Sequence, residues 1–235
     1  MKIAQNYNHP PLPEKRYQII YADPPWDYKG QQQHNGRGGR ETGGAVVHYP
    51  TVTTELMKKW DIARIADDNC LLFMWATSPH LDQAIDLGKA WGFQWATVGF
   101  VWDKQRVNPG FYTMSQCELC LIFKKNKIPW PRGMRSIRQM VSVPRSRHSE
   151  KPDEVRRRIQ AMFPQQTKIE LFARRKRNGW DVWGLDVTNL IPPTEYVQYN
   201  IATVHNDRTT PTLFLRDKRR TIEKNKKGRT TAYNI

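Results

Sequence analysis

Cysteine is scarce in this sequence. Its 235 residues include three cysteines, Cys70, Cys117 and Cys120. An odd number, without a second closely spaced pair, suits neither a four-cysteine zinc site nor a disulfide framework. Cys117 and Cys120 also lie in an apolar, strand-like run, where cysteine side chains are usually buried. We therefore expect no disulfide, no zinc site and a reducing compartment.

Acidic residues and long apolar runs are also few. The chain has 22 Asp and Glu residues against 38 Lys and Arg residues, which gives a formal net charge of +16. Such an excess favours a polyanionic partner, with nucleic acid as the first expectation. No apolar run is long enough to cross a membrane, and the first residues lack the apolar core of a signal peptide. We expect a soluble, cytoplasmic protein with no membrane partner.

The sequence does contain an alternation of strand-like and helix-like segments. Apolar, β-branched and aromatic runs predict strands over residues 17–22, 70–76, 94–102, 118–123, 167–173 and 179–184. Amphipathic segments predict helices over residues 54–65, over residues 78–92 and from Pro152 onward. This order predicts an α/β protein with a doubly wound, mostly parallel sheet and an antiparallel edge.

The chain is long enough for one sizeable domain, with or without a tail. Residues 1–16 are polar and proline-containing, and we expect a surface leader there. The core is predicted over residues 17–188, interrupted by a mobile loop at residues 30–44 and a basic loop at residues 124–147. Residues 189–235 are expected to form a basic tail with a short strand near residues 196–204. That tail either contacts nucleic acid or is disordered.

The strand over residues 17–22 ends in the tetrapeptide Asp23-Pro24-Pro25-Trp26. Neither proline has the N–H that a central strand needs, so the chain must leave the sheet directly after Asp23. Open α/β sheets bind their ligands at this carboxyl edge. The sequence therefore predicts a carboxylate fixed at the mouth of a ligand site, with an aromatic side chain beside it.

Such a carboxylate suits chemistry on an exocyclic amino group. The lone pair of an amino group on a heteroaromatic ring is delocalised, so its nitrogen is a poor nucleophile. Asp23 and the carbonyl of Pro24 can accept the two N–H hydrogens, which favours a pyramidal nitrogen with a localised lone pair. An aromatic face can hold the base by stacking. An ordinary turn after a strand also contains Asp and Pro often, and Asp-Pro alone would favour that interpretation.

Asp23-Pro24-Pro25-Trp26 resembles the catalytic tetrapeptide of the MT-A70 family of S-adenosylmethionine-dependent N6-adenine methyltransferases. Residues 149–154 resemble the family's Lys-Pro-Asp-Glu signature, and residues 168–174 its Ile-Glu-Leu-Phe-(Gly/Ala)-Arg strand. The resemblance covers residues 17–186. It implies a Rossmann-like methyltransferase fold in circularly permuted order, with the catalytic strand before the cofactor strand. It also implies S-adenosylmethionine as the cofactor. The late strand has no Gly-x-Gly fingerprint, so a nicotinamide site finds no support.

The residues and the resemblance together indicate three groups of site residues and no metal site. The expected catalytic residues are Asp23, Pro24, Pro25 and Trp26. Substrate binding is expected from Tyr49, Glu118, Lys151, Arg37 and Arg40. Cofactor binding is expected from Asp23, Lys151, Glu170, Leu171, Arg174, Asn178 and Asp186.

Several of these residues also fit ordinary structural roles. Tyr49 fits a tyrosine packed at a helix entrance, and Glu118 fits a solvent-facing acid at a strand end. Lys151 lies just ahead of a helix N-terminus and suits an anion, although it also fits a surface lysine. Glu170 is a strand acid that would be costly to bury without a partner. Its partner is either the cofactor or Arg174.

Two segments fit contacts with nucleic acid. Basic residues and Pro129-Trp130-Pro131 alternate in residues 124–147, as in a track for phosphates and stacked bases, although a solvated loop is the alternative. The loop at residues 30–44 fits either a lid that orders over nucleic acid or a flexible insertion. One position departs from the family pattern: Leu185 follows Trp183-Gly184 where the family usually has Asn. One cofactor hydrogen bond is therefore expected to be missing, while Asp186 can still serve the ribose.

We expect this chain to methylate N6 of adenine in DNA, with the base flipped out of the duplex. Basic regions at residues 124–147, 174–177 and 216–229 suit phosphates, and the resemblance implies that short members modify DNA in bacteria or phage-infected cells. The alternatives are an RNA N6-adenosine methyltransferase, a nonenzymatic nucleic-acid scaffold or a methyltransferase acting on protein glutamine. No target-recognition segment stands out, so low sequence specificity is expected. A homodimer and a partner subunit both remain open.

Overall fold

The computed structural model describes residues 6–27, 51–108, 112–145, 150–187 and 197–200. Contacts divide the chain into Met1–Ile201 and Ala202–Ile235, and every described residue belongs to the first unit. The loop predicted at residues 30–44 and most of the predicted tail lie outside the described residues.

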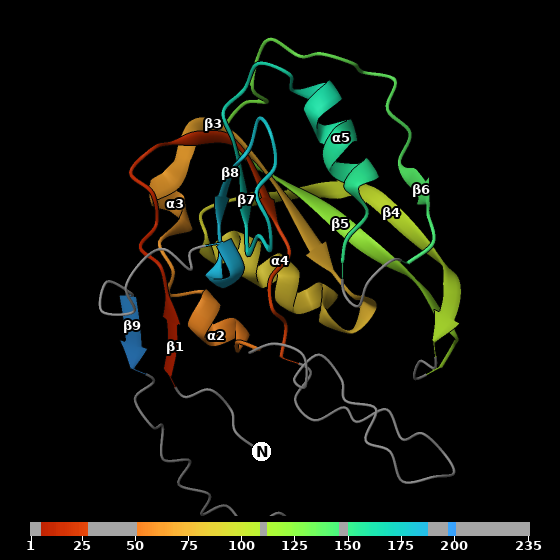
Figure 1. Ribbon diagram of the computed structural model, residues 1–235, viewed down its shortest axis with the longest axis horizontal. Helices are drawn as coiled ribbons and strands as arrows, with labels where there is room; N and C mark the ends of the chain where they lie inside the picture. Colours follow the sequence, from red (N-terminus) through yellow and green to blue (C-terminus); the bar gives the residue numbers. More distant parts are fainter. Residues whose placement is uncertain (1–5, 28–50, 109–111, 146–149, 188–196, 201–235) are drawn as a thin grey trace, which may run out of the picture. The chain divides into compact units, whose positions relative to one another are not determined.

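A seven-stranded sheet in the order β6-β4-β5-β3-β2-β7-β8 forms the centre of the described residues (Figure 1). Its strands are β2 (Tyr17–Ala22), β3 (Ala66–Ala76), β4 (Gln94–Asn108), β5 (Ser115–Lys125), β6 (Met140–Ser142), β7 (Lys168–Leu171) and β8 (Asp181–Trp183). β2 lies in the interior and pairs in parallel with β3 on one side and with β7 on the other. Its isoleucines and tyrosines suit a strand that is covered on both faces. The predicted α/β, mostly parallel fold is confirmed.

The antiparallel strand is not at the edge, where the sequence predicted it. β5 pairs antiparallel with both β3 and β4, and it is the third strand from one end of the sheet. β6 extends the sheet beyond β4, in parallel with it. The connection between β4 and β5 comprises residues 109–114 only, and so short a connection joins antiparallel neighbours. As a result, β5 begins at the edge where the parallel strands end.

Side chains alternate between the two faces of the sheet, as the strand pleat requires. Ile20 and Ala22 belong to the apolar cluster on one face, and Ile19 and Tyr21 belong to the cluster on the other. The first cluster includes residues of α2 (Thr54–Met57), α3 (Ile62–Ile65) and α4 (Leu81–Ala90), and the second includes residues of α5 (Asp153–Met162) (Figure 1). Helices thus cover both faces, as in a doubly wound fold.

Two predicted helices form close to their expected positions. The 3₁₀ turn η1 (Ser78–His80) contains Pro79 and leads into α4, which ends just before Gly92, a glycine with φ of +86°. Asp153 and Glu154 occupy the first turn of α5, where the helix dipole favours acids. Residues 54–65 instead form two short helices, because the chain turns between them and buries Trp60. No helix of the described residues is long and apolar enough to span a membrane.

A two-stranded sheet joins β1 (Asn6–His9) to β9 (Val197–Asn200) in antiparallel register. β9 lies within the stretch where the sequence predicted a late strand. His9 is buried, and its ring packs at 5.1 Å from Trp60 and 5.0 Å from Trp183. Burial lowers the pKa of His9, which favours its neutral form. Part of the expected surface leader is therefore anchored in the core.

Candidate active site

The backbone itself holds the turn that follows β2. The Pro24 carbonyl accepts a hydrogen bond from the Trp26 N–H at 2.9 Å, and the Pro25 carbonyl accepts one from the Val52 N–H at 2.9 Å. A carbonyl oxygen has two lone pairs, so Pro24 keeps one acceptor position. These bonds fix Asp23 at the carboxyl end of the sheet, where the sequence predicted it.

The Trp26 side chain anchors this turn in the core. Its indole is 4% exposed, and its Nε1–H donates to the Trp75 carbonyl at 3.1 Å. One face stacks on His80 at a centroid distance of 5.7 Å. His80 in turn contacts the Thr77 hydroxyl at 2.9 Å and the Asp27 carbonyl at 3.3 Å. The sequence suggested that Trp26 stacks the target base, whereas the buried indole offers little surface for a base.

Asp23 lies at one end of a row of alternating charges. The Lys151 ammonium is 2.8 Å from Oδ1 and 2.9 Å from Oδ2 of Asp23. The same ammonium is 3.4 Å from Oε2 of Glu118, and Oε1 of Glu118 is 3.5 Å from Nζ of Lys104. Four chain segments thus meet at one edge of the sheet: the end of β2, β4, β5 and the segment just ahead of α5.

The environment of Asp23 acts on its ionisation in two directions. Burial raises the pKa of Asp23 above its ordinary value, and the neighbouring Lys151 ammonium opposes that rise. The charge of Glu118 raises the Asp23 pKa further, while the charge of Arg174 lowers it. Ionisation of Asp23 therefore depends on the cations that surround it.

Aromatic side chains of the sheet face that α5 covers pack next to this row of charges. The Lys151 ammonium lies 5.7 Å from the centroid of the Trp75 ring, within the range of a cation–π contact. Trp75 Nε1–H donates to the Tyr21 hydroxyl at 2.6 Å. Burial raises the pKa of Tyr21 well above its usual value, so the phenol remains neutral. Lys151 is thus held by ion pairs with two acids and by a cation–π contact with Trp75.

Glu170 has an ion-pair partner that the sequence did not suggest. Arg156 on α5 approaches Oε2 of Glu170 at 3.3 Å and Oδ1 of Asp153 at 2.6 Å. The sequence suggested Arg174 or the cofactor as the partner. The Arg156 side chain is only 11% exposed, and it reaches from α5 to Glu170 on β7. Burial raises the pKa of Glu170, and Arg156 opposes that rise.

The remaining cofactor candidates differ in accessibility. Leu171 is fully buried in the core, so its side chain cannot contact a ligand at the surface. Arg174, Asn178 and Asp186 are exposed. Leu185 packs partly buried against the core cluster, which accounts for a leucine at that position.

Three of the substrate-binding candidates, Tyr49, Arg37 and Arg40, lie outside the described residues. The other two, Glu118 and Lys151, are brought into contact with each other. The structure therefore assembles Asp23, Glu118 and Lys151 from distant parts of the sequence.

Sequence reasoning missed Lys104, His80 and Arg156. Lys104 had a usable signal, because it continues the alternation of the buried side chains Phe100 and Trp102 along β4. A lysine at the third inward position of such a strand predicts a buried charge that requires an acid. His80 and Arg156 gave no comparable pattern.

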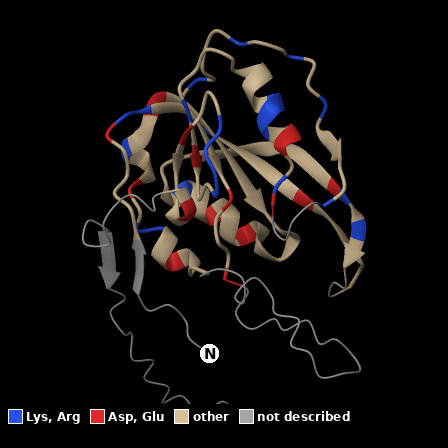
Figure 2. Ribbon diagram, in the orientation of Figure 1, with Lys and Arg blue, Asp and Glu red and all other residues tan. Residues whose placement is uncertain are grey.

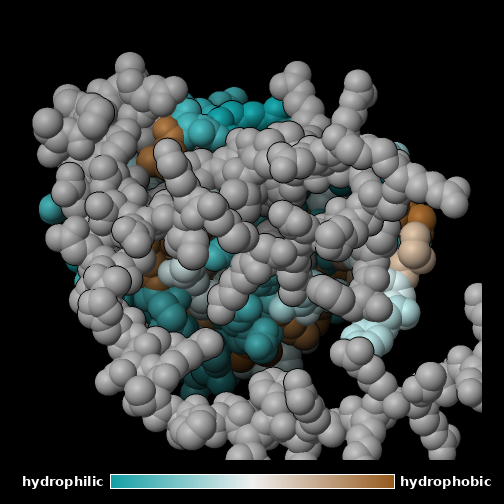
Figure 3. All heavy atoms as spheres, turned by 90° about the horizontal axis from the view of Figure 1, so that it is seen from below, coloured by the Kyte–Doolittle hydropathy of each residue, from teal (hydrophilic) through white to brown (hydrophobic). Residues whose placement is uncertain are grey.

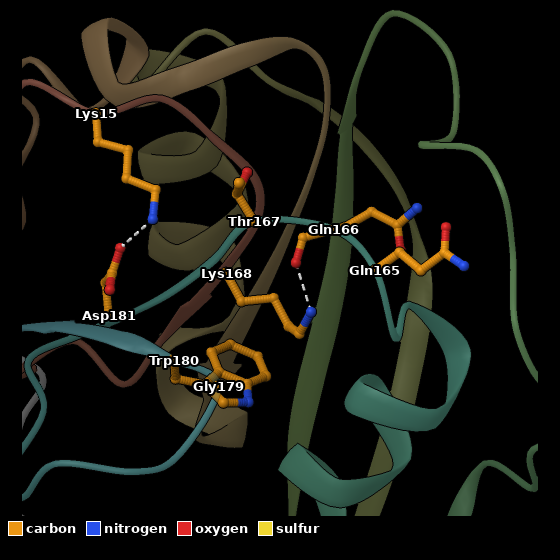
Figure 4. A pocket seen from close by; sticks show the side chains of 8 residues that line it. All are labelled: Lys15, Gln165, Gln166, Thr167, Lys168, Gly179, Trp180 and Asp181. Carbon is orange, nitrogen blue, oxygen red and sulfur yellow. Dashed lines mark hydrogen bonds and ion pairs between the residues drawn. The ribbon is translucent and has the colours of Figure 1, made fainter.

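A pocket of about 340 Å³ lies away from this edge (Figure 4). Its lining residues are Lys15, Gln165, Gln166, Thr167, Lys168, Gly179, Trp180 and Asp181. They precede β2, or lie at and just before the first residues of β7 and β8, so the pocket is at the amino edge of these parallel strands. Asp23 is at the opposite edge, and the pocket is therefore not part of the site around it.

The predicted basic loop follows the outer side of α5. Near its start, the N–H groups of Gly133 and Met134 donate to carbonyls of the last turn of α5. Further along, β6 pairs with β4, and the Arg145 N–H donates to the Lys104 carbonyl at 3.3 Å. Figure 2 shows Lys and Arg residues spaced along this segment. A basic path thus leads from the amino edge of the sheet to the charged row.

The view in Figure 3 shows the surface of one side of the molecule. Where described residues are visible there, hydrophilic side chains lie between smaller groups of hydrophobic ones. Trp130, at 70% exposed, and Tyr112, fully exposed, are the large aromatic side chains most open to solvent among the described residues. Trp130 carries the Arg135 guanidinium 5.5 Å from its ring centroid.

Comparison with known proteins places this arrangement in a family. The MT-A70 family model matches residues 17–186. The type II methyltransferase M.MunI of Mycoplasma sp is 48% identical over 188 residues, which cover 76% of this chain and 81% of M.MunI.

More distant relatives are much longer proteins. The human N(6)-adenosine-methyltransferase catalytic subunit METTL3 is 26% identical over 191 residues, which are 76% of this chain and 30% of METTL3. The mouse N(6)-adenine-specific methyltransferase METTL4 is 24% identical over 205 residues, 80% of this chain and 40% of METTL4. The chain therefore spans less than half the length of these two relatives.

Proposed function

Because this chain belongs to the MT-A70 family, we propose that it methylates N6 of adenine in DNA, with S-adenosylmethionine as the methyl donor. One observation carries the proposal. The Asp23 carboxylate is fixed at the carboxyl end of an interior strand, next to the Pro24 carbonyl and within 2.8 Å of the Lys151 ammonium. Two acceptors thus follow each other directly after the strand, and an amino group has two N–H hydrogens to donate.

Asp23 and Pro24 act on the amino nitrogen of adenine. The two acceptors each accept a hydrogen bond from one of its two N–H groups. These bonds favour a pyramidal nitrogen that is less conjugated with the ring, so that its lone pair becomes available. A carboxylate has about four acceptor positions, and Lys151 fills two of them. Asp23 can therefore keep its lysine and still accept a hydrogen bond from the base.

The charged groups around Asp23 fit S-adenosylmethionine. That molecule carries a carboxylate, an ammonium group and two ribose hydroxyls, and when bound it supplies a methyl group on a sulfonium. Lys151 suits its carboxylate, and the carboxylates of Asp23 and Glu170 suit its ammonium group and hydroxyls. The Glu170 side chain is 22% exposed beside Arg156, so one side of the acid can still accept hydrogen bonds.

Two observations favour duplex DNA as the substrate: the similarity to M.MunI and the positive net charge of the chain. M.MunI, a type II methyltransferase, is the more similar of the relatives described above and matches over most of its own length. The net charge of +16 and the basic path along α5 suit phosphates. An adenine inside a duplex must be flipped out before it reaches Asp23, at a cost of a few kcal/mol.

The test is methyl transfer from labelled S-adenosylmethionine to DNA and RNA oligonucleotides of the same sequence, with mass analysis of the nucleosides. Wild type should form N6-methyladenine in DNA, Asp23→Ala should form none, and Glu55→Ala, which changes an exposed acid on α2, should match wild type. Better transfer to RNA would favour the RNA enzyme, as the similarity to METTL3 suggests. Binding of nucleic acid without any transfer would indicate a scaffold.

A further inference from the structure

The charged row around Asp23 continues beyond the residues that the proposed chemistry uses. Its last member is Lys104 on β4, whose ammonium lies 3.5 Å from Oε1 of Glu118. The Lys104 side chain is 8% exposed, and that of Glu118 is 16% exposed. The far oxygen of Glu118 contacts Lys151, so one acid lies between two lysines.

A lysine at this position is costly. Its inward neighbours on β4 are Phe100 and Trp102, both almost fully buried. Burying an ammonium group is unfavourable unless an acid offsets the loss of hydration, and an apolar side chain of similar volume often gives an equal or greater stability. Stability of the core alone does not account for a lysine at position 104.

The geometry points to a role for Lys104 in the active site, and this inference rests on the proposed function. We propose that Lys104 is a positioning residue that acts through Glu118 to keep the Lys151 ammonium on Asp23. Lys151 is closer to Asp23, at 2.8 Å, than to Glu118, at 3.4 Å. With Lys104 in place, the negative charge of Glu118 is partly offset by the Lys104 ammonium. Glu118 therefore attracts the Lys151 ammonium only weakly. Without Lys104, Glu118 draws Lys151 towards itself and away from Asp23.

The consequence falls on the ionisation of Asp23, since Lys151 opposes the effect of burial there. The charged and titratable groups that act on Asp23 or respond to its charge come from every neighbouring element: Lys151 ahead of α5, Glu118 and Cys120 on β5, Tyr21 on β2, Glu170 on β7 and Arg174 after β7. Lys104 touches only Glu118 in this set. Lys104 is not among the charges that shift the pKa of Asp23 directly, so the proposed route passes through Glu118 and Lys151.

The first experiment compares the pH profiles of kcat/KM for methyl transfer by wild type, Lys104→Met and Lys104→Arg. In Lys104→Met the acid limb should move to higher pH by about one unit, the lower end of the effect of a nearby opposite charge. Lys104→Arg keeps the charge and should restore the wild-type limb. The control is Lys89→Met, which removes one exposed lysine from α4 and should leave the limb in place. An acid limb that does not move in Lys104→Met overturns the proposal.

The second experiment asks whether Lys104 acts through Glu118. Glu118→Gln removes the acid that links the two lysines, so adding Lys104→Met to that variant should cause no further shift. A shift of equal size in both backgrounds would overturn the indirect route. Thermal unfolding of every variant shows whether the comparison is between folded proteins.

The third experiment needs no catalysis. Carbon-13 NMR of labelled aspartate carboxyls, with Asp23→Asn to assign the signal, reports the titration of Asp23 directly. The Asp23 titration should move to higher pH in Lys104→Met and not in Lys89→Met. This shift in a protein without methyl transfer would uphold the role of Lys104 while the proposed function fails. An unmoved titration would reject the role of Lys104 alone.

Discussion

A carboxylate accepts hydrogen bonds from an amino group through both oxygens only while it is ionised, and two influences compete at Asp23. Burial raises its pKa above the ordinary value of 3.8, and Lys151 opposes that rise. The amino acid at position 151 therefore sets the pH range in which Asp23 can act. This control of the Asp23 ionisation acts at the scale of single residues, because it depends on the 2.8 Å contact between Lys151 and Asp23.

Methyl transfer should be lost as the pH falls through the raised pKa of Asp23, and Lys151→Met should shift that loss to higher pH. The measurement is kcat/KM against pH for both proteins. Stability should respond in the opposite direction: the folded-state pKa is above the unfolded one, so the contribution of Asp23 to the free energy of unfolding rises as the pH falls. An acid limb that is the same in both proteins would contradict the role assigned to Lys151.

A second residue-scale prediction separates two roles of Trp26. Trp26→Phe keeps a ring in the core but leaves the Trp75 carbonyl without its donor, which should lower the free energy of unfolding by about 1–3 kcal/mol. Because the indole is buried, kcat should stay within about threefold of wild type, a barrier change of less than 1 kcal/mol. Thermal unfolding and steady-state kinetics check the two parts. A large loss of kcat at unchanged stability would instead indicate contact with the base.

At the scale of elements, the close approach of β7 and β8 depends on one glycine. A Cβ atom at Gly184 would lie 2.7 Å from the backbone oxygen and 2.8 Å from the backbone nitrogen of Ala173. Gly184→Ala should therefore lower the free energy of unfolding by about 1–3 kcal/mol, since backbone atoms cannot move aside easily. Chemical denaturation measures this, with Lys176→Ala, an exposed change in the connection between β7 and β8, as the control. Equal stability of the two variants would show that the strands can separate at little cost.

The elements also show what a sequence can predict. β2, β3, α4 and α5 carry local signals: apolar runs, a proline in the entry turn and a glycine at the exit. β6 was missed within the basic loop, because three residues are too few to show a period of two. The interior position of β5 could not be predicted, since it depends on β5 inserting between β3 and β4 and pairing with both.

In the candidate site, too, some residues could be predicted from the sequence and others could not. Asp23, Lys151 and Glu118 were predicted from motifs, and the structure brings them together. The pairing of Glu170 with Arg156 was not predicted, because it depends on how α5 lies against β7. The burial of Trp26 depends on tertiary contacts with His80 and Trp75. Motifs thus identified residues, while their partners required the fold.

At the scale of the whole molecule, the excess of positive charge should act through the basic path along α5. Replacing both Arg135 and Arg138 with Gln should weaken binding to DNA and reduce the slope of log K against log salt by up to about 2, since each phosphate contact contributes about 0.9. The control is the double variant Lys58→Gln and Lys89→Gln, with the same charge change just after α2 and on α4. Fluorescence anisotropy at several salt concentrations measures the slopes. Equal slopes for the two variants would place the DNA elsewhere.

The position of β2 also governs when this protein can fold during its synthesis. One edge of β2 pairs with β3, which follows soon in the chain, but the other pairs with β7, where Ile20 meets Ile169. A nascent chain therefore leaves one edge of β2 unpaired until β7 has been made. Ribosome-bound fragments that end before β7 should remain dependent on chaperones. The strand that ends at Asp23 is thus completed only after a segment that follows it by more than a hundred residues.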